Sequence, residues 1–174
     1  MSTSEKPYHH GDLRTALIDA AESLLEKTGD ISLREAARAA QVSPAAAYRH
    51  FSDKDALVAA VAARGFQAFG VLLEAAAARE PDNALAALGR AYIRFALAGP
   101  ARFRLMFGPL LSRSADHPDL LQASRRTFAA LEEVTGNTDD ALRRWSMVHG
   151  LAHLLLDGAH QTDDVDALLE RLVR

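Results

Sequence analysis

The sequence predicts an all-α protein of about nine helices. Apolar residues recur with the three-to-four-residue spacing of a helix that buries one face, and no stretch alternates apolar and polar residues as a half-buried strand does. Glycine and proline stand between the periodic segments, where they end one helix and begin the next. The 174 residues contain no cysteine, which excludes disulfides and cysteine-ligated metals. We therefore expect helices packed on helices, in one domain or two small ones.

The first helix is expected to open at Gly11-Asp12, with Asp12 as its N-cap, and to stop at Gly29. Two short helices follow. Ser32 caps the first of them, and Glu35 three residues later completes a capping box. Residues 41–43 then form a tight turn into the second. Two short helices across such a turn are typical of a helix-turn-helix motif.

The second short helix is the candidate recognition helix, and it runs to about Phe51. Proline at its first position costs nothing, because that N–H has no partner in a helix. An α-helix fits the major groove of DNA, and its first residues meet the base edges. Arg49 could donate two hydrogen bonds to a guanine, and Ala45 or Ala46 could contact a thymine methyl group. The residues assigned to this DNA-facing surface are Ser43, Pro44, Ala45, Ala46, Tyr48 and Arg49.

Three segments carry a resemblance to a known family: Y-H-H-G-D-L-R at residues 8–14, S-L-R-E-A-A at 32–37 and V-S-P-A-A-A-Y-R-H-F-S-D-K at 42–54. Residues 8–54 resemble the DNA-binding head of TetR-family transcriptional regulators. The resemblance implies that Arg34 reaches a base or a nearby phosphate. It also implies that Tyr48, His50 and Lys54 contact phosphates or the groove.

Several of these assignments have alternatives. Tyr8-His9-His10 either follows the DNA backbone as an arm or packs on the head. Tyr48 could be partly core and His50 a buried histidine with a hydrogen-bond partner, whereas Phe51 is assigned to the core. The family usually has glycine at the position of Gln41, and a residue with a side chain in the left-handed region costs about 1–2 kcal/mol. Either this turn is reshaped or its packing holds the strain.

The charge of the chain gives DNA binding no general support. The net charge is −3, and residues 1–64 hold eight Lys and Arg against nine Asp and Glu. A protein that binds nucleic acid without sequence preference is normally basic. Local placement of cations must therefore carry the interaction, and they lie in the motif at Arg34, Arg38, Arg49 and Lys54.

The rest of the chain is also expected to be helical. A long helix should run from Asp53 to about Arg79, with Ser52 as its cap, and should break at Glu80-Pro81-Asp82. The further predicted helices are 83–98, 100–107, 118–134, 138–158 with Thr138 as its cap, and a last one that Asp163 opens, while 110–117 is expected to be a loop. We divide the chain into a helix-turn-helix DNA-binding domain at 1–55 and a helical ligand-binding and dimerisation domain at 56–174.

The second domain carries family-like segments of its own, P-A-R-F-R-L-M-F-G at 100–108 and W-x-x-x-H-G-L at 145–151. They resemble the TetR subgroup with a W-H-G type C-terminal domain, which implies a homodimer. The helix 138–158 is apolar on more than one face, and such surplus apolar surface indicates a partner. The residues expected at the dimer interface are Leu151, Leu154, Leu155, Leu168, Leu169 and Leu172. A twofold dimer would read a pseudo-palindromic operator in double-stranded DNA.

Aromatic and flexible residues of the second domain could line a pocket for a small, mostly apolar effector. The alternative for each of them is an ordinary core position. The candidate pocket residues are Phe66, Phe69, Tyr92, Phe95, Phe103, Met106, Phe107, Phe128, Trp145 and His149.

Other functions have less support. His149 and His153 are spaced for a metal chelate, but no Glu or Cys joins them, and we expect structural histidines without metal or cofactor. No phosphate-binding loop, nucleophile elbow or H-E-x-x-H motif is present, so an enzyme is not expected. The absence of a signal peptide and of a spanning apolar run predicts a cytoplasmic protein without membrane contact. The sequence thus favours a ligand-released repressor, with an effector-independent DNA-binding dimer as the alternative.

Overall fold

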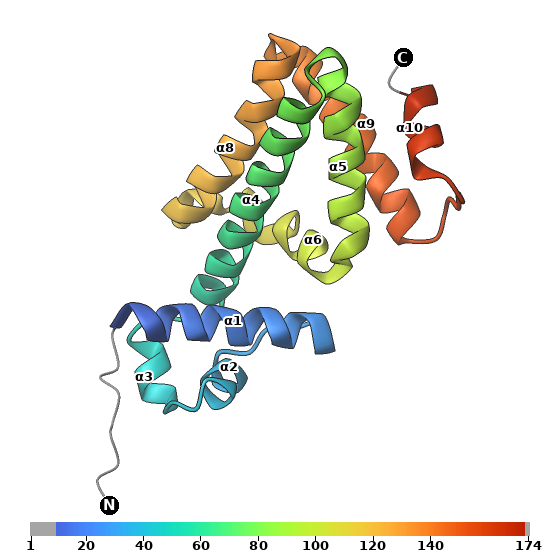
Figure 1. Ribbon diagram of the computed structural model, residues 1–174. Helices are drawn as coiled ribbons and strands as arrows, with labels where there is room; N and C mark the ends of the chain where they lie inside the picture. The colour runs from blue at the N-terminus through green and yellow to red at the C-terminus, as the bar shows by residue number, and fades with distance from the viewer. Residues whose placement is uncertain (1–9, 173–174) are drawn as a thin grey trace, which may run out of the picture. The chain divides into compact units, whose positions relative to one another are not determined.

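A computed structural model describes residues 10–172, which form ten α-helices and two short 3₁₀-helices without any strand (Figure 1). The all-α class is thereby confirmed. The candidate arm Tyr8-His9-His10 lies largely outside the described residues. The elements are α1 (His10–Thr28), α2 (Leu33–Ala39), α3 (Pro44–Tyr48), α4 (Lys54–Arg79), η1 (Pro81–Asn83), α5 (Ala84–Ala98), α6 (Pro100–Met106), α7 (Pro109–Ser112), η2 (Ser114–Asp116), α8 (Pro118–Thr135), α9 (Thr138–Leu156) and α10 (Val165–Leu172).

The chain divides into two compact units, Met1–Val61 and Ala62–Arg174, which we call the head and the body. In the head, α2 packs against α1 and α3, and both short helices lie on one side of α1 in Figure 1. The head core is built from small and medium apolar side chains that are almost wholly buried: Leu17, Ala21, Ala36, Ala37, Ala47 and Leu57. Alanine at the helix contacts lets the backbones approach closely, which fixes the position of α3.

In the body, α5 contacts α6, α8, α9 and α10. The body part of α4 packs beside α8 and α5 (Figure 1), with Phe69 stacked 4.5 Å from the Phe95 ring and 5.0 Å from the Tyr92 ring. Thr127 joins α8 to α4 directly, because its hydroxyl donates to the Phe66 carbonyl at 3.0 Å. Aromatic contacts between α4 and α5 thus lie in the interior of the body.

Helix α4 is long and apolar enough, by length and composition alone, to cross a membrane. The sequence was expected to contain no such run, and this expectation was wrong. However, 61% of the apolar window is buried inside the protein, as in the core helix of a globular fold.

Three helix caps lie one residue away from their predicted positions. In each case the oxygen of an aspartate or asparagine side chain accepts the backbone N–H three residues later, at 2.8–2.9 Å. Each correct cap stands beside another good capping residue, so composition alone could not separate the two. The caps are Asp53 in place of Ser52 at α4, Asn137 in place of Thr138 at α9, and Asp164 in place of Asp163 at α10.

The ends of two other elements also differ. Helix α1 begins at His10, so Asp12 lies inside its first turn rather than at the cap. Helix α3 ends at Tyr48 rather than near Phe51. The predicted loop 110–117 instead contains α7 and η2, because Pro109 pre-sets the first turn of α7 and the Ser112 hydroxyl bonds back to the Pro109 carbonyl at 2.7 Å.

Candidate functional sites

The turn between α2 and α3 has the geometry that a helix-turn-helix requires. Gln41 has φ 58°, and it is the one non-glycine residue with positive φ in the described part of the chain. The N–H of Val42 donates to the Ala37 carbonyl at 2.9 Å and closes the turn. The turn has therefore kept its left-handed residue, and the surrounding hydrogen bonds hold the strain that glycine would have avoided.

The caps on either side of this turn are as predicted. Ser32 Oγ accepts the N–H of Glu35 at 3.4 Å, and Ser43 Oγ accepts the N–H of Ala46 at 3.2 Å. The Glu35 carboxylate does not complete the capping box but lies 3.5 Å from the Arg38 guanidinium. Because its oxygen accepts this N–H, the Ser43 side chain fixes the first turn of α3, whatever contact it also makes with DNA.

Helix α3 presents a small exposed face. Ala47 and, just past the helix, Phe51 are buried on the inner side, and the Arg14 guanidinium lies 5.2 Å from the centre of the Phe51 ring. Tyr48 is 47% exposed, so a fully buried role for this side chain is excluded. His50 is half-buried and engaged with a neighbour, which leaves both of its predicted roles open. Of the other candidate DNA contacts, Ala46 is half-buried, and the exposed ones are Arg34, Ser43, Pro44, Ala45, Arg49 and Lys54.

Lys54 has a partner that the sequence did not suggest. Its Nζ lies 2.7 Å from Oδ1 of Asp30, and this hydrogen bond, followed by one from the backbone of Ile31, lowers the pKa of the Asp30 carboxyl. Both side chains are exposed, and exposed ion pairs contribute about 0–1 kcal/mol. Lys54 can therefore exchange Asp30 for another anion at little cost.

The body encloses a cavity of about 570 Å³, a volume within the range of small-molecule sites. It lies between α4, α5, α8 and α9, with α7 and η2 adding one side. Six of the ten candidate pocket residues line it: Phe66, Phe69, Tyr92, Phe107, Phe128 and Trp145. Met147, one of the flexible residues expected at a pocket, also lines it. Most of the other lining residues were not predicted; they include Leu73, Leu85, Leu88, Leu111, Ser114, Ser124, Arg125, Thr127, Leu131, Glu132, Arg144 and Val148.

Four candidate pocket residues do not line the cavity. Phe103 and Met106 are wholly buried in the core beneath α6. Phe95 stacks on Phe69, and its ring is covered by the Arg102 guanidinium at 4.7 Å. His149 lies behind Tyr92, to which it is hydrogen-bonded. Aromatic character alone could not distinguish the residues that face the cavity from those that support it.

Three polar side chains are bonded in series beside the cavity. The indole Nε1 of Trp145 donates to the Tyr92 oxygen at 3.1 Å, and the same oxygen lies 2.8 Å from Nδ1 of His149. Burial raises the pKa of the Tyr92 phenol, against the opposing effect of the Trp145 bond. Burial, and to a lesser extent the charge of His153, lower the pKa of His149.

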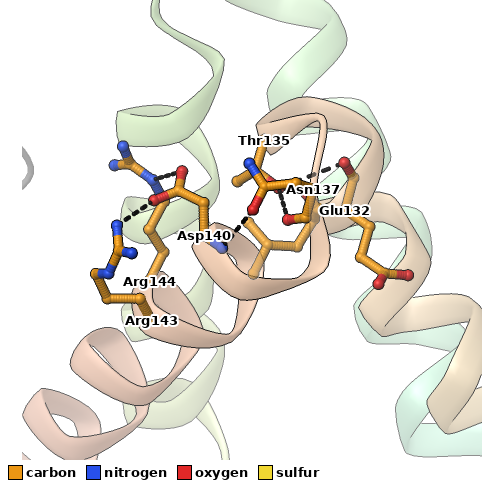
Figure 2. A network of polar contacts seen from close by, with 7 residues as sticks. Glu132, Thr135, Asn137, Asp140, Arg143 and Arg144 are labelled. Atoms are coloured by element: carbon orange, nitrogen blue, oxygen red, sulfur yellow. Dashed lines mark hydrogen bonds and ion pairs between the residues drawn. The ribbon is translucent and has the colours of Figure 1, made fainter.

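A second polar network holds the turn between α8 and α9, where Gly136 adopts φ 75° (Figure 2). The Asp140 carboxylate accepts hydrogen bonds from Arg144 at 2.7 Å and from Arg143 at 2.9 Å, while the Asn137 side chain caps α9. The Glu132 carboxylate accepts the hydroxyl of Thr138 at 2.6 Å. Glu132 and Arg144 also line the cavity, so these two charged groups are compensated by neighbouring side chains.

Comparison with known proteins gives these two regions a family. The family model described as "Bacterial regulatory proteins, tetR family" matches residues 17–61, and the model described as "Tetracyclin repressor-like, C-terminal domain" matches residues 85–174, more than half of the chain. The chain belongs to the TetR family. It is therefore a DNA-binding transcriptional regulator, of a family whose members are generally not enzymes.

Solved structures agree with this assignment. A protein with unknown function from Rhodococcus sp. RHA1 has 32% sequence identity and a TM-score of 0.79, with 97% of this chain and 95% of that chain covered. The multidrug binding protein EbrR, in complex with imidazole, has 19% identity and a TM-score of 0.71 over 99% of this chain and 94% of its own. RolR, in complex with resorcinol, has 24% identity and a TM-score of 0.58 over 91% and 84%. No curated protein matches the sequence.

The candidate dimer residues of this TetR-family chain differ in exposure. Leu151 and Leu169 are buried within the protomer, Leu155 and Leu168 are half-buried, and Leu154 is 50% exposed. Leu172 is exposed at the end of α10. The exposed face of α9 also contains residues that were not assigned to the interface: Leu142, Ser146 and Gly150.

His149 and His153 of α9 are close neighbours. The rings of His149 and His153 lie 4.7 Å apart, but Nδ1 of His149 is engaged with Tyr92. Over residues 10–172, no group of three or more His, Asp or Glu side chains is placed to hold a metal ion.

Proposed function

We propose that the protein is a homodimeric, cytoplasmic repressor that leaves a pseudo-palindromic operator when a small, mostly apolar molecule occupies the body cavity. Residues 1–55 act as the DNA-binding domain and residues 56–174 as the ligand-binding and dimerisation domain. The observation that carries the proposal is the cavity itself: about 570 Å³ of space lined mainly by aromatic and aliphatic side chains. A body that served only to dimerise would be packed solid, because empty apolar volume lowers stability.

The exposed face of α3 supports the DNA-binding part. Tyr48 ends α3 and Arg49 is its C-cap residue. The Ser43 cap fixes the first turn of this helix, the end from which base edges in the major groove are read. Lys54 follows at the first position of α4, where free backbone N–H groups also attract a phosphate. The Lys54 side chain is exposed even though it pairs with Asp30.

Similar folds support the ligand part. The EbrR structure is described as that of a multidrug binding protein complexed with imidazole, and the RolR structure as a complex with resorcinol. Both ligands are small ring compounds. A ligand that binds the released state about 10⁴-fold more tightly than the DNA-bound state would shift occupancy from 1:99 to 99:1.

The first experiment is a selection from random-sequence DNA with the full-length protein, followed by fluorescence anisotropy on the selected site. We expect salt-dependent binding that Tyr48→Ala and Lys54→Ala weaken by at least about tenfold, which is the cost of losing one good contact. Val71→Ser, on an exposed face of α4 away from the motif, is the control that should bind normally. A selection that yields no sequence, or variants that bind like the wild type, would contradict the proposed DNA-binding surface.

Dimerisation has its own test, by sedimentation velocity. Leu154→Glu places a charge on the exposed face of α9 and should shift the protein towards a monomer, since burial of an unpaired charge is costly. Leu97→Glu, at an exposed leucine of α5, is the matched control and should remain dimeric. The same sedimentation coefficient for both variants would place the interface elsewhere.

A further inference from the structure

Tyr92 brings a polar hydroxyl group to a largely apolar cavity wall. Two of its hydrogen bonds are formed inside the protein, with Nε1 of Trp145 and with Nδ1 of His149. A hydroxyl has one hydrogen to donate and two lone pairs with which to accept. The directions of the two existing bonds therefore decide what Tyr92 can still offer to a ligand.

Both directions follow from elementary acid–base chemistry. The indole N–H can only donate, so the Tyr92 oxygen accepts from Trp145. Between a phenol and a neutral imidazole, the phenol is the stronger acid and the imidazole nitrogen the stronger base, so Tyr92 donates to His149. The bond received from Trp145 strengthens this donation, because hydrogen bonds in a chain polarise one another. Burial keeps His149 neutral near neutral pH by lowering its pKa, which leaves Nδ1 able to accept.

With its hydrogen and one lone pair engaged, Tyr92 has a single lone pair left. We infer that the cavity selects ligands that bring a hydrogen-bond donor, a hydroxyl or an N–H group, to the oxygen of Tyr92. This inference rests on the proposed role of the cavity as the effector site. Compounds of the same shape that bring only an acceptor, such as ethers or ketones, would bind less tightly. Their oxygen lone pairs would face the remaining lone pair of Tyr92 without a hydrogen between them.

Other hydroxyl groups of the lining also donate their hydrogen to acceptors within the protein, so that their lone pairs remain for a ligand. The hydroxyl of Thr127 donates to the carbonyls of Phe66 and Ala123, at 3.0 Å each, and that of Ser124 donates to the Leu121 carbonyl at 3.1 Å. Among the lining residues that the structure describes, Ser114 alone keeps a hydroxyl hydrogen without an acceptor. The hydroxyl groups of the lining therefore offer mainly acceptor positions to a ligand.

Two of the three charged lining residues are engaged by neighbouring side chains. Arg144 is engaged by Asp140, and Glu132 accepts from Thr138, whereas Arg125 lies at an exposed part of the wall. The class of effector that fits is a mostly apolar ring compound with a hydroxyl or amino group.

The test compares three compounds of nearly equal shape: 9-phenanthrol, 9-methoxyphenanthrene and phenanthrene. Binding to the full-length protein is measured by equilibrium dialysis at neutral pH. We expect the phenol to bind about tenfold more tightly than the ether, which is the factor for one buried hydrogen bond gained against an unsatisfied pair. In Tyr92→Phe this preference should fall to within about twofold, because the acceptor is gone.

His149→Leu tests the direction of the relay. Without its acceptor, the hydroxyl hydrogen of Tyr92 is free to turn to the ligand, so the ether should gain affinity and the preference for the phenol should disappear or reverse. His153→Leu, one helical turn away and without a bond to Tyr92, is the matched control and should keep the wild-type preference. A merely structural role of His149 would weaken all three compounds alike.

Each outcome is decisive. Equal affinity of the phenol and the ether for the wild-type protein, with phenanthrene bound, would overturn the inference and leave the ligand pocket standing. An unchanged preference in His149→Leu would overturn the assigned direction of the relay. Failure of phenanthrene and both derivatives to bind would overturn the ligand pocket and this inference together.

Discussion

The head and the body build their candidate sites over very different distances along the chain. In the head, the proposed DNA contacts lie between Arg34 and Lys54, and α2, the turn and α3 are held largely by bonds between residues three to five positions apart. In the body, the cavity draws on residues from Phe66 to Val148 and on four long helices. A site made of local structure can be read from a short motif, whereas a site made of packing depends on how distant side chains share one interior.

The largest expected effect is on stability, and it distinguishes a buried aromatic ring of the body from an exposed one of the head. Phe103→Ala, at a wholly buried ring of α6, should lower the free energy of unfolding by about 3–5 kcal/mol, the usual cost of removing a buried phenylalanine. Tyr48→Ala, at the exposed ring of α3, should change it by less than about 0.5 kcal/mol while DNA binding weakens by at least about tenfold. Chemical denaturation of both variants measures the contrast. Equal losses of stability would mean that the head packs as tightly around Tyr48 as the body does around Phe103.

Two helix glycines of the body allow the same comparison between a tightly packed position and an open one. A Cβ at Gly65 of α4 would lie 2.6 Å from Sδ of Met106, which is itself wholly buried, so Met106 would have to shift within a packed core. Gly65→Ala should therefore cost about 1–2 kcal/mol, because overpacking outweighs the roughly 1 kcal/mol by which alanine favours a helix. Thermal unfolding provides the measurement.

The matched variant is Gly150→Ala in α9, where nothing lies within 4 Å of the added carbon. Here the helix preference acts alone, and stability should rise by about 0.5–1 kcal/mol. A loss of stability at Gly150 would indicate that a second protomer packs closely on this face of α9. A gain at Gly65 would show that Met106 is more mobile than its burial implies.

These contrasts explain which parts of the structure were predictable. The all-α class, the helix-turn-helix and the caps at Ser32 and Ser43 follow from local patterns, and the structure has them. The cap errors at α4, α9 and α10 arose where two capping residues are adjacent, since the difference between them depends on the exact path of the preceding loop. Local patterns thus fix which elements form more securely than they fix where each one starts.

The pocket residues were harder to predict from local patterns than the helices were. Aromatic composition found Phe66, Tyr92 and Trp145, but it equally suggested Phe103, which faces the core. The polar lining was missed because Ser114 and Thr127 reach the cavity only through the packing of η2 and α8 against other helices. The partner of Lys54 was missed for a similar reason, since Asp30 is 24 residues away in the sequence.

In the head, the turn offers a variant that should stabilise the fold. Gln41 holds φ 58°, which costs about 1–2 kcal/mol for a residue with a side chain. Gln41→Gly removes that strain but adds freedom to the unfolded chain, so we expect a net gain of about 1 kcal/mol. Gln41→Asn should give a smaller gain, because asparagine tolerates the left-handed region better than glutamine. A loss of stability in both variants would show that the glutamine side chain makes contacts worth more than the strain.

The smallest expected effect concerns the charge beside the proposed DNA surface. The Asp30 carboxylate lies 2.7 Å from the ammonium group of Lys54, so it competes with a DNA phosphate for this lysine. Asp30→Asn removes the competing charge and should raise DNA affinity about two- to fivefold, the equivalent of an exposed ion pair. Anisotropy titrations on the selected operator at two salt concentrations provide the measurement. Asp139→Asn, which removes one negative charge from the first turn of α9 in the body, controls for the change in net charge. If both variants raise affinity equally, the gain comes from the overall charge, and Lys54 is already free to reach the phosphate.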